Sequence, residues 1–567
     1  MKSVMCAYNA VDGTAACANK MLLKDHLRDA WKFNGFVVSD CGAIVDVYNG
    51  HHNAPDIMNA SVISLQAGTD LSCSMWTPGF NTLADAVGKG AVSEALLTRA
   101  AERLFTARIE LGMFDPPGAN ASDKIPFSAN TSKKSRQLAL RAAEESMVLL
   151  KNNSTLPLRE APANIAVIGP TADLLVSLEG NYNGTPLHPV SPLDGITKRF
   201  AASEIHYAQG STLAEGVSVP VPRTAFGSGL KTEYYAGAVC AGRPVAIGTD
   251  AEIQANWGES APVPEVQTHD YCVRWTGKLS VPTPGKYTFE VEPGDSAFPF
   301  SPRETYRVVL DGKASEGELN SGKPNTSEKT GANPTAPPRN SDQHSAQIEF
   351  TFTDTNPHAF TLDYTHSNDR AGGGVTLKWN APADAQLAQA VSAAKASDIV
   401  LAFVGLSPQL EGEEMPVKIP GFSGGDRTSI DLPAPQQKLL EAVTAAGKPV
   451  VVVSLSGSAL ALTWAKDHAA AILQAWYPGV EGGTAIARTL AGDNNPAGRL
   501  PVTFYAGVTD LPAFTDYSMK GRTYRYYSGK PLWGFGYGLS YSAFKYGTAK
   551  LSAGPLQAGQ PLTTTVN

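Results

Sequence analysis

The sequence lacks the features that mark several large classes of protein. Its 567 residues hold 46 lysines and arginines against 53 aspartates and glutamates, a formal net charge of −7. This leaves no basic surplus to favour a nucleic-acid partner. No apolar run reaches the roughly 18 residues that a membrane-spanning helix needs, so we expect no membrane span. The first residues have neither the basic nor the apolar region of a signal peptide.

Cysteine is also scarce, with six residues in the whole chain. Neither a Cys-x-x-Cys motif nor a cluster of histidines accompanies them, so no zinc site is expected. Their even number and the Ser-, Thr- and Gly-rich loops fit an oxidising compartment, and six reduced, buried thiols are the alternative. Sequence does not fix the connectivity. By position, the candidate pairs are Cys6 with Cys17, Cys41 with Cys73, and Cys240 with Cys272.

The sequence does have the composition of a soluble globular protein, with 43% hydrophobic and 17% charged residues. Its length exceeds one hydrophobic core, which predicts three to four domains.

The first hundred residues show a strand-helix repeat. Apolar runs that suit buried strands occur at 3–8, 36–39 and 67–73, and segments 21–31 and 57–65 between them are apolar at helical spacing. A repeat of about 30 residues is typical of βαβ units in a parallel sheet. Three units are visible, whereas a (β/α)8 barrel needs eight. We therefore expect the C-terminal portion of such a barrel, with Met1 inside a longer protein.

Changes in composition and hydrophobic periodicity along the chain predict an α/β multidomain protein of five parts, one of which is divided into two segments. Residues 225–382 show apolar and polar residues alternating with period two, with Gly, Pro and Asp turns between the runs. This all-β pattern separates two regions with an α/β pattern. The expected parts are a barrel portion at 1–115, a linker at 116–130, an α/β sandwich at 131–224 and 383–545, an inserted β-sandwich at 225–382, and the first strand of a cut-off domain at 546–567.

Carboxylates at strand ends are the candidate catalytic groups. Asp40 follows the apolar run 36–39, and the carboxyl ends of barrel strands are where catalytic groups project. A helix cap or an ion-pair partner is the alternative for Asp40. The loop after the apolar strand 399–404 holds Glu411, Glu413 and Glu414, whose mutual repulsion favours a proton, a cation or substrate nearby, although a solvated acidic loop fits as well. Asp70 is expected to be structural.

Several segments, in order along nearly the whole chain outside 225–382, resemble glycoside hydrolase family 3. They are Ser3–Gly13, Gly35–Asp40, Ser146–Asn152, Ile165–Pro170, Ala475–Gly483, Gly498–Phe504, Lys520–Tyr526 and Gly534–Tyr541. The segment 225–382 resembles the protective-antigen type β-sandwich that some members carry at this place. The last residues resemble the start of a fibronectin-like domain.

The resemblance implies a retaining exo-β-glycosidase without a cofactor, secreted or periplasmic, acting on β-glycosides. Asp40 would be the nucleophile, and Tyr8 would orient it and contact the sugar. The acid/base would be the sixth residue past Gly405, which is Glu411, with Glu413 and Glu414 as rivals.

The residue after the nucleophile bears on the sugar. It is Cys41 here, as in many β-xylosidases and arabinosidases of the family, where β-glucosidases often have tryptophan. The resemblance therefore favours a β-D-xylosidase, with a β-glucosidase as the alternative. A non-catalytic carbohydrate-binding protein is the alternative from another class.

Overall fold

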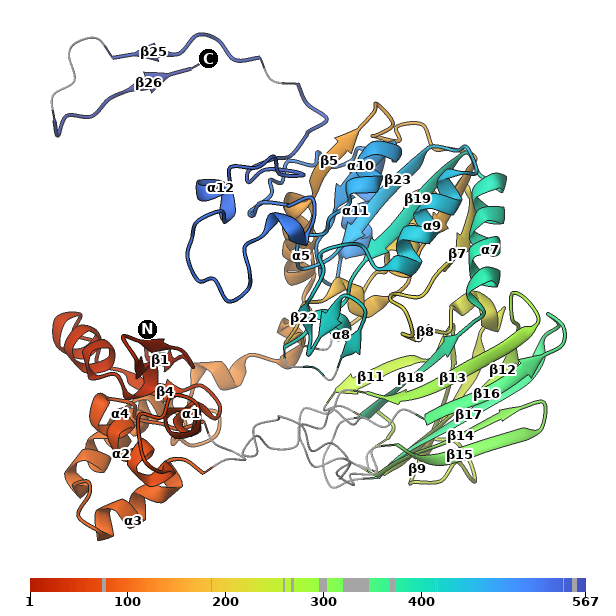
Figure 1. Ribbon diagram of the computed structural model, residues 1–567. Helices are drawn as coiled ribbons and strands as arrows, with labels where there is room; N and C mark the ends of the chain where they lie inside the picture. The colour runs from red at the N-terminus through yellow and green to blue at the C-terminus, as the bar shows by residue number, and fades with distance from the viewer. Residues whose placement is uncertain are drawn as a thin grey trace. The chain divides into compact units, whose positions relative to one another are not determined.

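A computed structural model describes residues 1–73, 78–184, 186–258, 261–266, 270–294, 303–319, 346–367, 373–413, 415, 417–543, 545–552 and 558–566. Within these residues the chain forms two compact units, residues 1–130 and the described residues from 131 onward. The architecture is mixed α/β (Figure 1). No helix among the described residues is both long and apolar enough to cross a membrane.

The first unit is built on parallel strands. β1 (Ser3–Cys6) pairs in parallel with β4 (Phe36–Ser39), and Val38 of β4 forms a parallel bridge with Leu71. The remaining elements of the unit are β2 (Ala10–Val11), β3 (Thr14–Ala15), η1 (Ala16–Ala18), η2 (Met21–Ala30), α1 (Ala43–Asn49), α2 (Ile57–Ala67), η3 (Phe80–Thr82), α3 (Leu83–Gly88), α4 (Glu94–Glu110), η4 (Ala121–Lys124) and η5 (Phe127–Ala129). The expected helix at 21–31 forms as a π-helix, η2.

The strand expected at 67–73 is wrong in extent. Ala67 ends helix α2, and only Leu71 bridges β4. The reason lies in Asp70, whose Oδ2 accepts the backbone N–H of Val37 at 2.8 Å. The Asp70 side chain thus accepts a backbone N–H of β4 that a neighbouring strand would otherwise accept through a carbonyl. The backbone pairing between β4 and residues 67–73 is therefore limited to the bridge at Leu71.

The second unit contains a six-stranded sheet in the order β5-β24-β23-β19-β6-β7. All neighbours are parallel except β5, which runs antiparallel to β24. The strands are β5 (Val148–Asn152), β6 (Asn164–Ile168), β7 (Glu204–Ala208), β19 (Ile399–Gly405), β23 (Val450–Leu455) and β24 (Ala471–Gln474). The strand expected at 399–404 is confirmed as β19, which extends one residue further.

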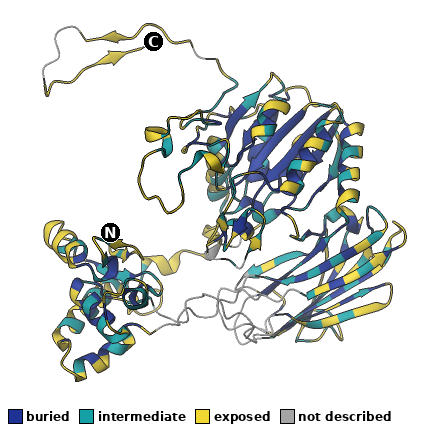
Figure 2. Ribbon diagram, viewed as in Figure 1, coloured by how far each residue is buried: buried dark blue, intermediate teal, exposed yellow. Residues whose placement is uncertain are grey.

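Helices cover this sheet, and its central strands are buried throughout (Figure 2). Alternate side chains of β19 enter two separate buried clusters: Val400 and Ala402 pack with Leu439 of α9, and Leu401 and Phe403 pack with residues of α11. The helices are α5 (Lys133–Ser146), η6 (Leu175–Leu178), α6 (Pro192–Arg199), α7 (Ala383–Ala396), α8 (Pro408–Glu411), α9 (Ala434–Thr444), α10 (Thr463–His468), α11 (Gly482–Ala491), η8 (Val508–Asp510) and α12 (Thr523–Tyr526).

Between β7 and α7 the chain forms two antiparallel sheets. One has the order β10-β9-β12-β17-β14-β15; the other has the order β11-β18-β13-β16, with β8 paired to β18. The elements are β8 (Val219–Pro220), η7 (Arg223–Phe226), β9 (Leu230–Ala236), β10 (Ala246–Asp250), β11 (Gln254–Gly258), β12 (Tyr271–Leu279), β13 (Gly285–Pro293), β14 (Arg303–Leu310), β15 (Lys313–Leu319), β16 (Ala346–Phe352), β17 (His358–Ser367) and β18 (Gly373–Asn380).

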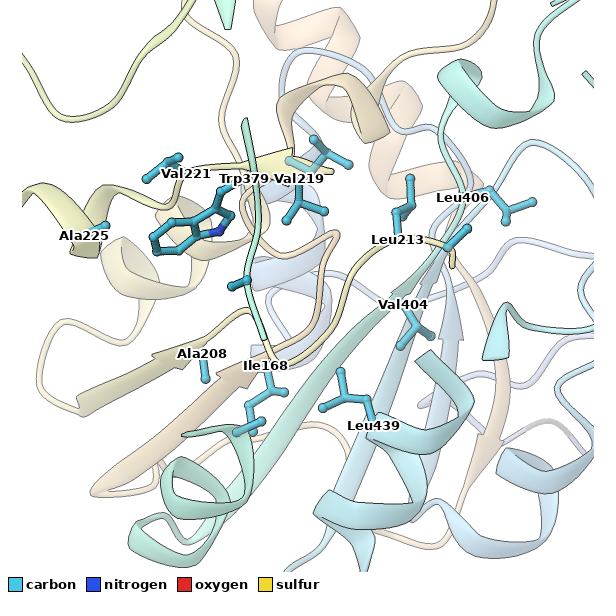
Figure 3. Packing of buried hydrophobic residues seen from close by; sticks show 14 of the residues in the cluster. Ile168, Ala208, Leu213, Val219, Val221, Ala225, Trp379, Val404, Leu406 and Leu439 are labelled. Carbon is cyan, nitrogen blue, oxygen red and sulfur yellow. The ribbon is translucent and has the colours of Figure 1, made fainter. Parts of the chain in front are cut away.

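This β-rich region and the six-stranded sheet share one buried cluster. Trp379 of β18 and Val219 of β8 lie in the same cluster as Ile168 and Val404 of the sheet and Leu439 of α9 (Figure 3). The β-rich region and the six-stranded sheet are therefore packed together through one apolar core. Three short strand pairs complete the unit: β20 (Lys418–Ile419) with β21 (Phe422–Ser423), β21 with β22 (Asp426–Arg427), and β25 (Lys550–Leu551) with β26 (Thr564–Thr565).

Candidate active site

Asp40 stands where β4 ends. Its N–H donates to the carbonyl of Cys6 at 3.1 Å, which extends the parallel β1–β4 ladder by one bond. Gly42, with φ +85°, then turns the chain into helix α1, a conformation that glycine adopts without strain. The carboxyl group is half-buried, and its Oδ1 accepts the N–H of Cys41 at 2.7 Å. The sequence pattern therefore places a partly accessible carboxylate at a strand end.

The neighbours predicted for Asp40 gather around the following turn. Tyr8 donates its hydroxyl hydrogen to the carbonyl of Cys41 at 2.6 Å, and a ring nitrogen of His51 lies 2.6 Å from the carbonyl of Tyr8. Cys41 is disulfide-bonded to Cys73, whose carbonyl accepts the N–H of Gly42 at 2.9 Å. A side-chain bond, a disulfide and a backbone bond thus fix the backbone that carries Asp40.

The structure also joins the other cysteines in the candidate pairs, Cys6 with Cys17 and Cys240 with Cys272.

Asp70 has a structural environment. Its side chain is 1% exposed and ion-paired with Arg28 at 2.5 Å and with Arg103 at 2.7 Å. With the Val37 N–H as a third donor, this carboxylate ties β4 to η2 and α4.

The acidic loop of the second unit begins where β19 ends. Gly405 has φ +141°, and a Cβ there would lie 1.8 Å from the carbonyl oxygen of Leu455 in β23. Only glycine allows the strands this approach. The short helix α8 follows at once and ends with Glu411.

Glu411 is bonded through both carboxylate oxygens, and its side chain is 9% exposed. Oε1 accepts the hydroxyl of Tyr477 at 2.5 Å and the N–H of Gly457 at 3.1 Å. Oε2 accepts the hydroxyl of Ser458 at 2.5 Å and lies 4.0 Å from Nη1 of Arg427. The residue thus links its own loop to the turns that follow β23 and β24.

The electrostatics of this cluster follow from its burial. Burial and the Glu411 carboxylate both raise the pKa of the Tyr477 phenol, so Tyr477 is a constant hydrogen donor. Burial lowers the pKa of the Arg427 guanidinium, and the nearby Glu411 opposes that shift. The negative charge of Glu411 is thereby enclosed by donors.

Glu413 differs from Glu411 in exposure. It is exposed, and its carboxylate accepts a short hydrogen bond from the hydroxyl of Tyr182, itself exposed. The third glutamate, Glu414, lies outside the described residues.

The residues that hold Glu411 escaped prediction, because their role depends on contacts 46 to 66 positions away along the chain. Tyr477 stands in the segment 475–483 that carried the family resemblance, and this was a usable signal. Gly457 and Ser458 had none beyond following a buried strand. Among the described residues, no group of three or more His, Cys, Asp or Glu side chains is arranged to hold a metal ion.

Two family models match this chain. Its residues 1–107 match the glycosyl hydrolase family 3 N terminal domain, and residues 147–541, more than half of the chain, match the glycosyl hydrolase family 3 C-terminal domain.

Two curated relatives and one solved structure align with almost the whole chain. A xylan 1,4-β-xylosidase of Xylanibacter ruminicola is 35% identical over 98% of this chain and 61% of that protein. A β-glucosidase of Rhizobium radiobacter is 30% identical over 100% of this chain and 66% of that protein. The exo-β-xylosidase XlnD, solved with a xylobiose aziridine probe, superposes with a TM-score of 0.60 at 25% identity, over 97% of this chain and 49% of that one. The chain spans no more than 66% of the length of these proteins. It belongs to glycosyl hydrolase family 3.

Proposed function

We propose that the protein is a retaining exo-β-glycosidase that removes terminal, non-reducing β-D-xylose. The observation that carries this proposal is the half-buried Asp40 at the end of β4, held by the Tyr8–Cys41 bond in a chain of this family. The name of the Xylanibacter ruminicola relative supports xylose as the sugar. β-Glucosidase is the alternative, supported by the Rhizobium radiobacter relative.

In the proposed reaction Asp40 is the nucleophile. Its carboxylate attacks the anomeric carbon and forms a covalent glycosyl-enzyme while a carboxylic acid protonates the departing oxygen. The same acid, now a carboxylate, then takes a proton from the water that releases the sugar. Tyr8 is a positioning residue for Asp40, because it holds the carbonyl of the next residue.

For the acid/base, the family resemblance pointed to Glu411, and the geometry supports its neighbour Glu413. A group that shuttles protons must reach substrate and water. Glu411 is 9% exposed with both oxygens occupied by donors, whereas Glu413 is exposed. We therefore assign proton transfer to Glu413 and give Glu411 the role of a positioning residue that fixes the loop.

The domain assignments belong to the same proposal. Residues 1–115 are units of a (β/α)8 barrel, 116–130 a linker, and 131–224 with 383–545 an α/β sandwich. Residues 225–382 form a carbohydrate-binding-like sandwich of the protective-antigen type, and 546–567 begin a fibronectin-like domain. Three disulfides favour a secreted or periplasmic location.

The test uses this 567-residue chain with p-nitrophenyl β-xyloside and β-glucoside. We expect turnover by the unmutated chain and none by Asp40→Ala. We also expect a 2-deoxy-2-fluoro-β-xyloside to label the peptide that contains Asp40. Asp85→Ala, at an exposed position of α3, is the matched control and retains activity. Sugar binding without turnover in the unmutated chain would instead favour the carbohydrate-binding alternative.

The disulfide next to Asp40 underlies the choice of sugar. We propose that Cys41–Cys73 occupies the space that the hydroxymethyl group of a hexose would need. Exclusion of one such group corresponds to about 1–3 kcal/mol, or roughly 10- to 200-fold in kcat/KM. Equal kcat/KM values for xyloside and glucoside would contradict this.

A further inference from the structure

The loop that follows helix α1 reaches back to the residue that holds the turn after Asp40. Nε2 of His51 lies 2.6 Å from the carbonyl oxygen of Tyr8. Because a carbonyl oxygen can only accept, Nε2 carries the hydrogen of this bond and donates it. Tyr8 donates to the carbonyl of Cys41, whose N–H donates to Oδ1 of Asp40. Successive hydrogen bonds thus connect His51 to the candidate nucleophile.

Tyr8 is a residue whose place has to be fixed by such contacts. It lies in residues 7–9, between β1 and β2, which belong to neither strand, and it is 41% exposed. An exposed side chain on an irregular segment has backbone and rotamer freedom that each bond must restrict. The donor of His51 restricts the backbone of Tyr8 at its own carbonyl. The phenol is then placed for its 2.6 Å bond to Cys41.

The loop that carries His51 is itself anchored to helix α1. The N–H of His51 donates to the carbonyl of Asp46 at 2.7 Å, and the N–H of Asn53 donates to the carbonyl of Val47 at 2.9 Å. Between them His52 has φ +53°, in the left-handed region that an L-residue adopts at tight turns. The donor on His51 is therefore presented from a fixed turn.

Asn53 binds the far end of the segment that holds Tyr8. Its side-chain amide accepts the N–H of Ala15 at 2.7 Å and donates to the carbonyl of Gly13 at 3.0 Å. It also donates to the carbonyl of His51 at 3.3 Å. The loop 50–53 thus holds residues 8–15 at both ends, and His51 provides the contact at the end next to Asp40.

We propose that His51 is a positioning residue for the nucleophile and acts through Tyr8 and the turn at Cys41. This rests on the proposed function, in which the Asp40 carboxylate attacks the anomeric carbon. The N–H of Cys41 orients that carboxylate, and its own place depends on the bond from Tyr8. A displacement of about 1 Å at reacting groups costs about 100-fold in rate, so an indirect contact of this kind affects catalysis.

The rate at which a dinitrophenyl 2-deoxy-2-fluoro-β-xyloside labels Asp40 tests this. Its leaving group departs without protonation, so the rate reports attack by the carboxylate and not proton transfer. His51→Phe keeps a ring but removes the donor, and labelling is expected to slow by about 10- to 100-fold. His51→Gln offers an amide N–H at similar reach and should label at nearly the unmutated rate.

The neighbouring histidine supplies the matched control. The ring of His52 lies 3.2 Å from the carbonyl of Tyr48 in α1 and not against the segment that carries Tyr8. Asparagine tolerates the left-handed conformation at this position, so His52→Asn should label at the unmutated rate.

A double variant separates a path through Tyr8 from an independent effect. Tyr8→Phe removes the phenol hydrogen bond, so adding His51→Phe should slow labelling no further. Losses that multiply in the double variant would overturn the proposal. So would labelling of His51→Phe at the unmutated rate, or labelling of His51→Gln as slow as that of His51→Phe.

Hydrogen exchange in peptides covering residues 36–43 gives a readout that does not depend on turnover. Exchange should be faster in His51→Phe and Tyr8→Phe and unchanged in His51→Gln and His52→Asn, because only the first two loosen the turn at Cys41. Unchanged exchange in α4 (Glu94–Glu110) would show that the unit stays folded. If the unmutated chain is not labelled, the proposed function fails and exchange alone decides the role of His51. Equal exchange in all four variants would overturn that role.

Discussion

The phenol of Tyr477 donates a 2.5 Å hydrogen bond to Oε1 of Glu411, joining the turn after β24 to the loop after β19. Parallel strands bring their carboxyl ends to one edge of a sheet, and ligands bind at that edge. Between β19 and α9 the described residues form only the four-residue helix α8 and three two-residue strands, so the shape of this loop depends on such contacts. The single carboxylate of Glu411 accepts hydrogen bonds from the turns after both β23 and β24.

Replacing Tyr477 by phenylalanine removes this bond without changing the ring. A hydrogen bond to a charged group contributes about 1.5–3 kcal/mol, so the free energy of unfolding is expected to fall by about 2 kcal/mol. Faster proteolysis within residues 406–431 should accompany the loss. Denaturant unfolding and limited proteolysis measure both effects. Tyr517→Phe, at a 90% exposed tyrosine, serves as the control, and equal stability of the two variants would contradict the role of Glu411 as a clamp.

Glu413→Ala is expected to show the signature of a lost general acid. Proton transfer contributes about 10²- to 10⁴-fold, so kcat/KM should fall in this range for xylosides with poor leaving groups. The loss should be much smaller for dinitrophenyl xyloside, whose leaving group departs without protonation. Azide, which attacks the glycosyl-enzyme without a base, should restore turnover and yield β-xylosyl azide.

Glu411→Gln is the matched comparison for Glu413→Ala. It should lower stability, because a neutral amide replaces a charge enclosed by Tyr477, Ser458 and Arg427. It should show no azide rescue and no dependence on the leaving group. The reverse pattern, with rescue in Glu411→Gln alone, would return the acid/base role to Glu411.

Asp70→Asn is expected to destabilise the first unit. The change removes the charge that Arg28 and Arg103 share in a side chain 1% exposed. Breaking a buried ion pair costs about 3–5 kcal/mol. Thermal and denaturant unfolding measure the effect, with Asp85→Asn on the exposed face of α3 as the control. A loss below about 1 kcal/mol would show that water replaces the carboxylate.

The features that could be predicted from the sequence are those that depend on residues close together in the chain. Apolar runs such as 399–404 become buried strands wherever helices cover both faces, and Asp40 follows from the end of one such run. The partners of Glu411 could not be predicted, because the chain returns to it from Gly457 and Tyr477 only after the sheet has formed. The expected extent of the strand at 67–73 was wrong for a similar reason, since the side chain of Asp70 replaces a backbone acceptor.

A partly buried charge cluster links the β-rich region to the six-stranded sheet. Arg223 of η7 bonds Asp173 at 2.6 Å and Asp194 of α6 at 2.7 Å, and lies 3.8 Å from Glu252. Three carboxylates thus face one guanidinium. Burial, together with the charge of Asp173, raises the pKa of Glu252 to about 7, and burial also raises the pKa of Asp173.

These raised pKa values predict how stability depends on pH. The folded state holds the proton of Glu252 more tightly than the unfolded state, whose pKa is near 4.5. The contribution of Glu252 to the free energy of unfolding is therefore fully present below about pH 4.5. It is lost as the pH rises through about 7, and the loss is on the order of 2–3 kcal/mol. Glu252→Gln keeps the shape and hydrogen-bonding capacity of the protonated acid, so it should flatten this part of the profile and be more stable than the unmutated chain at pH 8. Denaturant unfolding from pH 4.5 to 8 measures the difference between the two chains, with Glu318→Gln on the exposed side of β15 as the control. Parallel profiles for Glu252→Gln and the unmutated chain would show that Arg223 keeps all three carboxylates ionised.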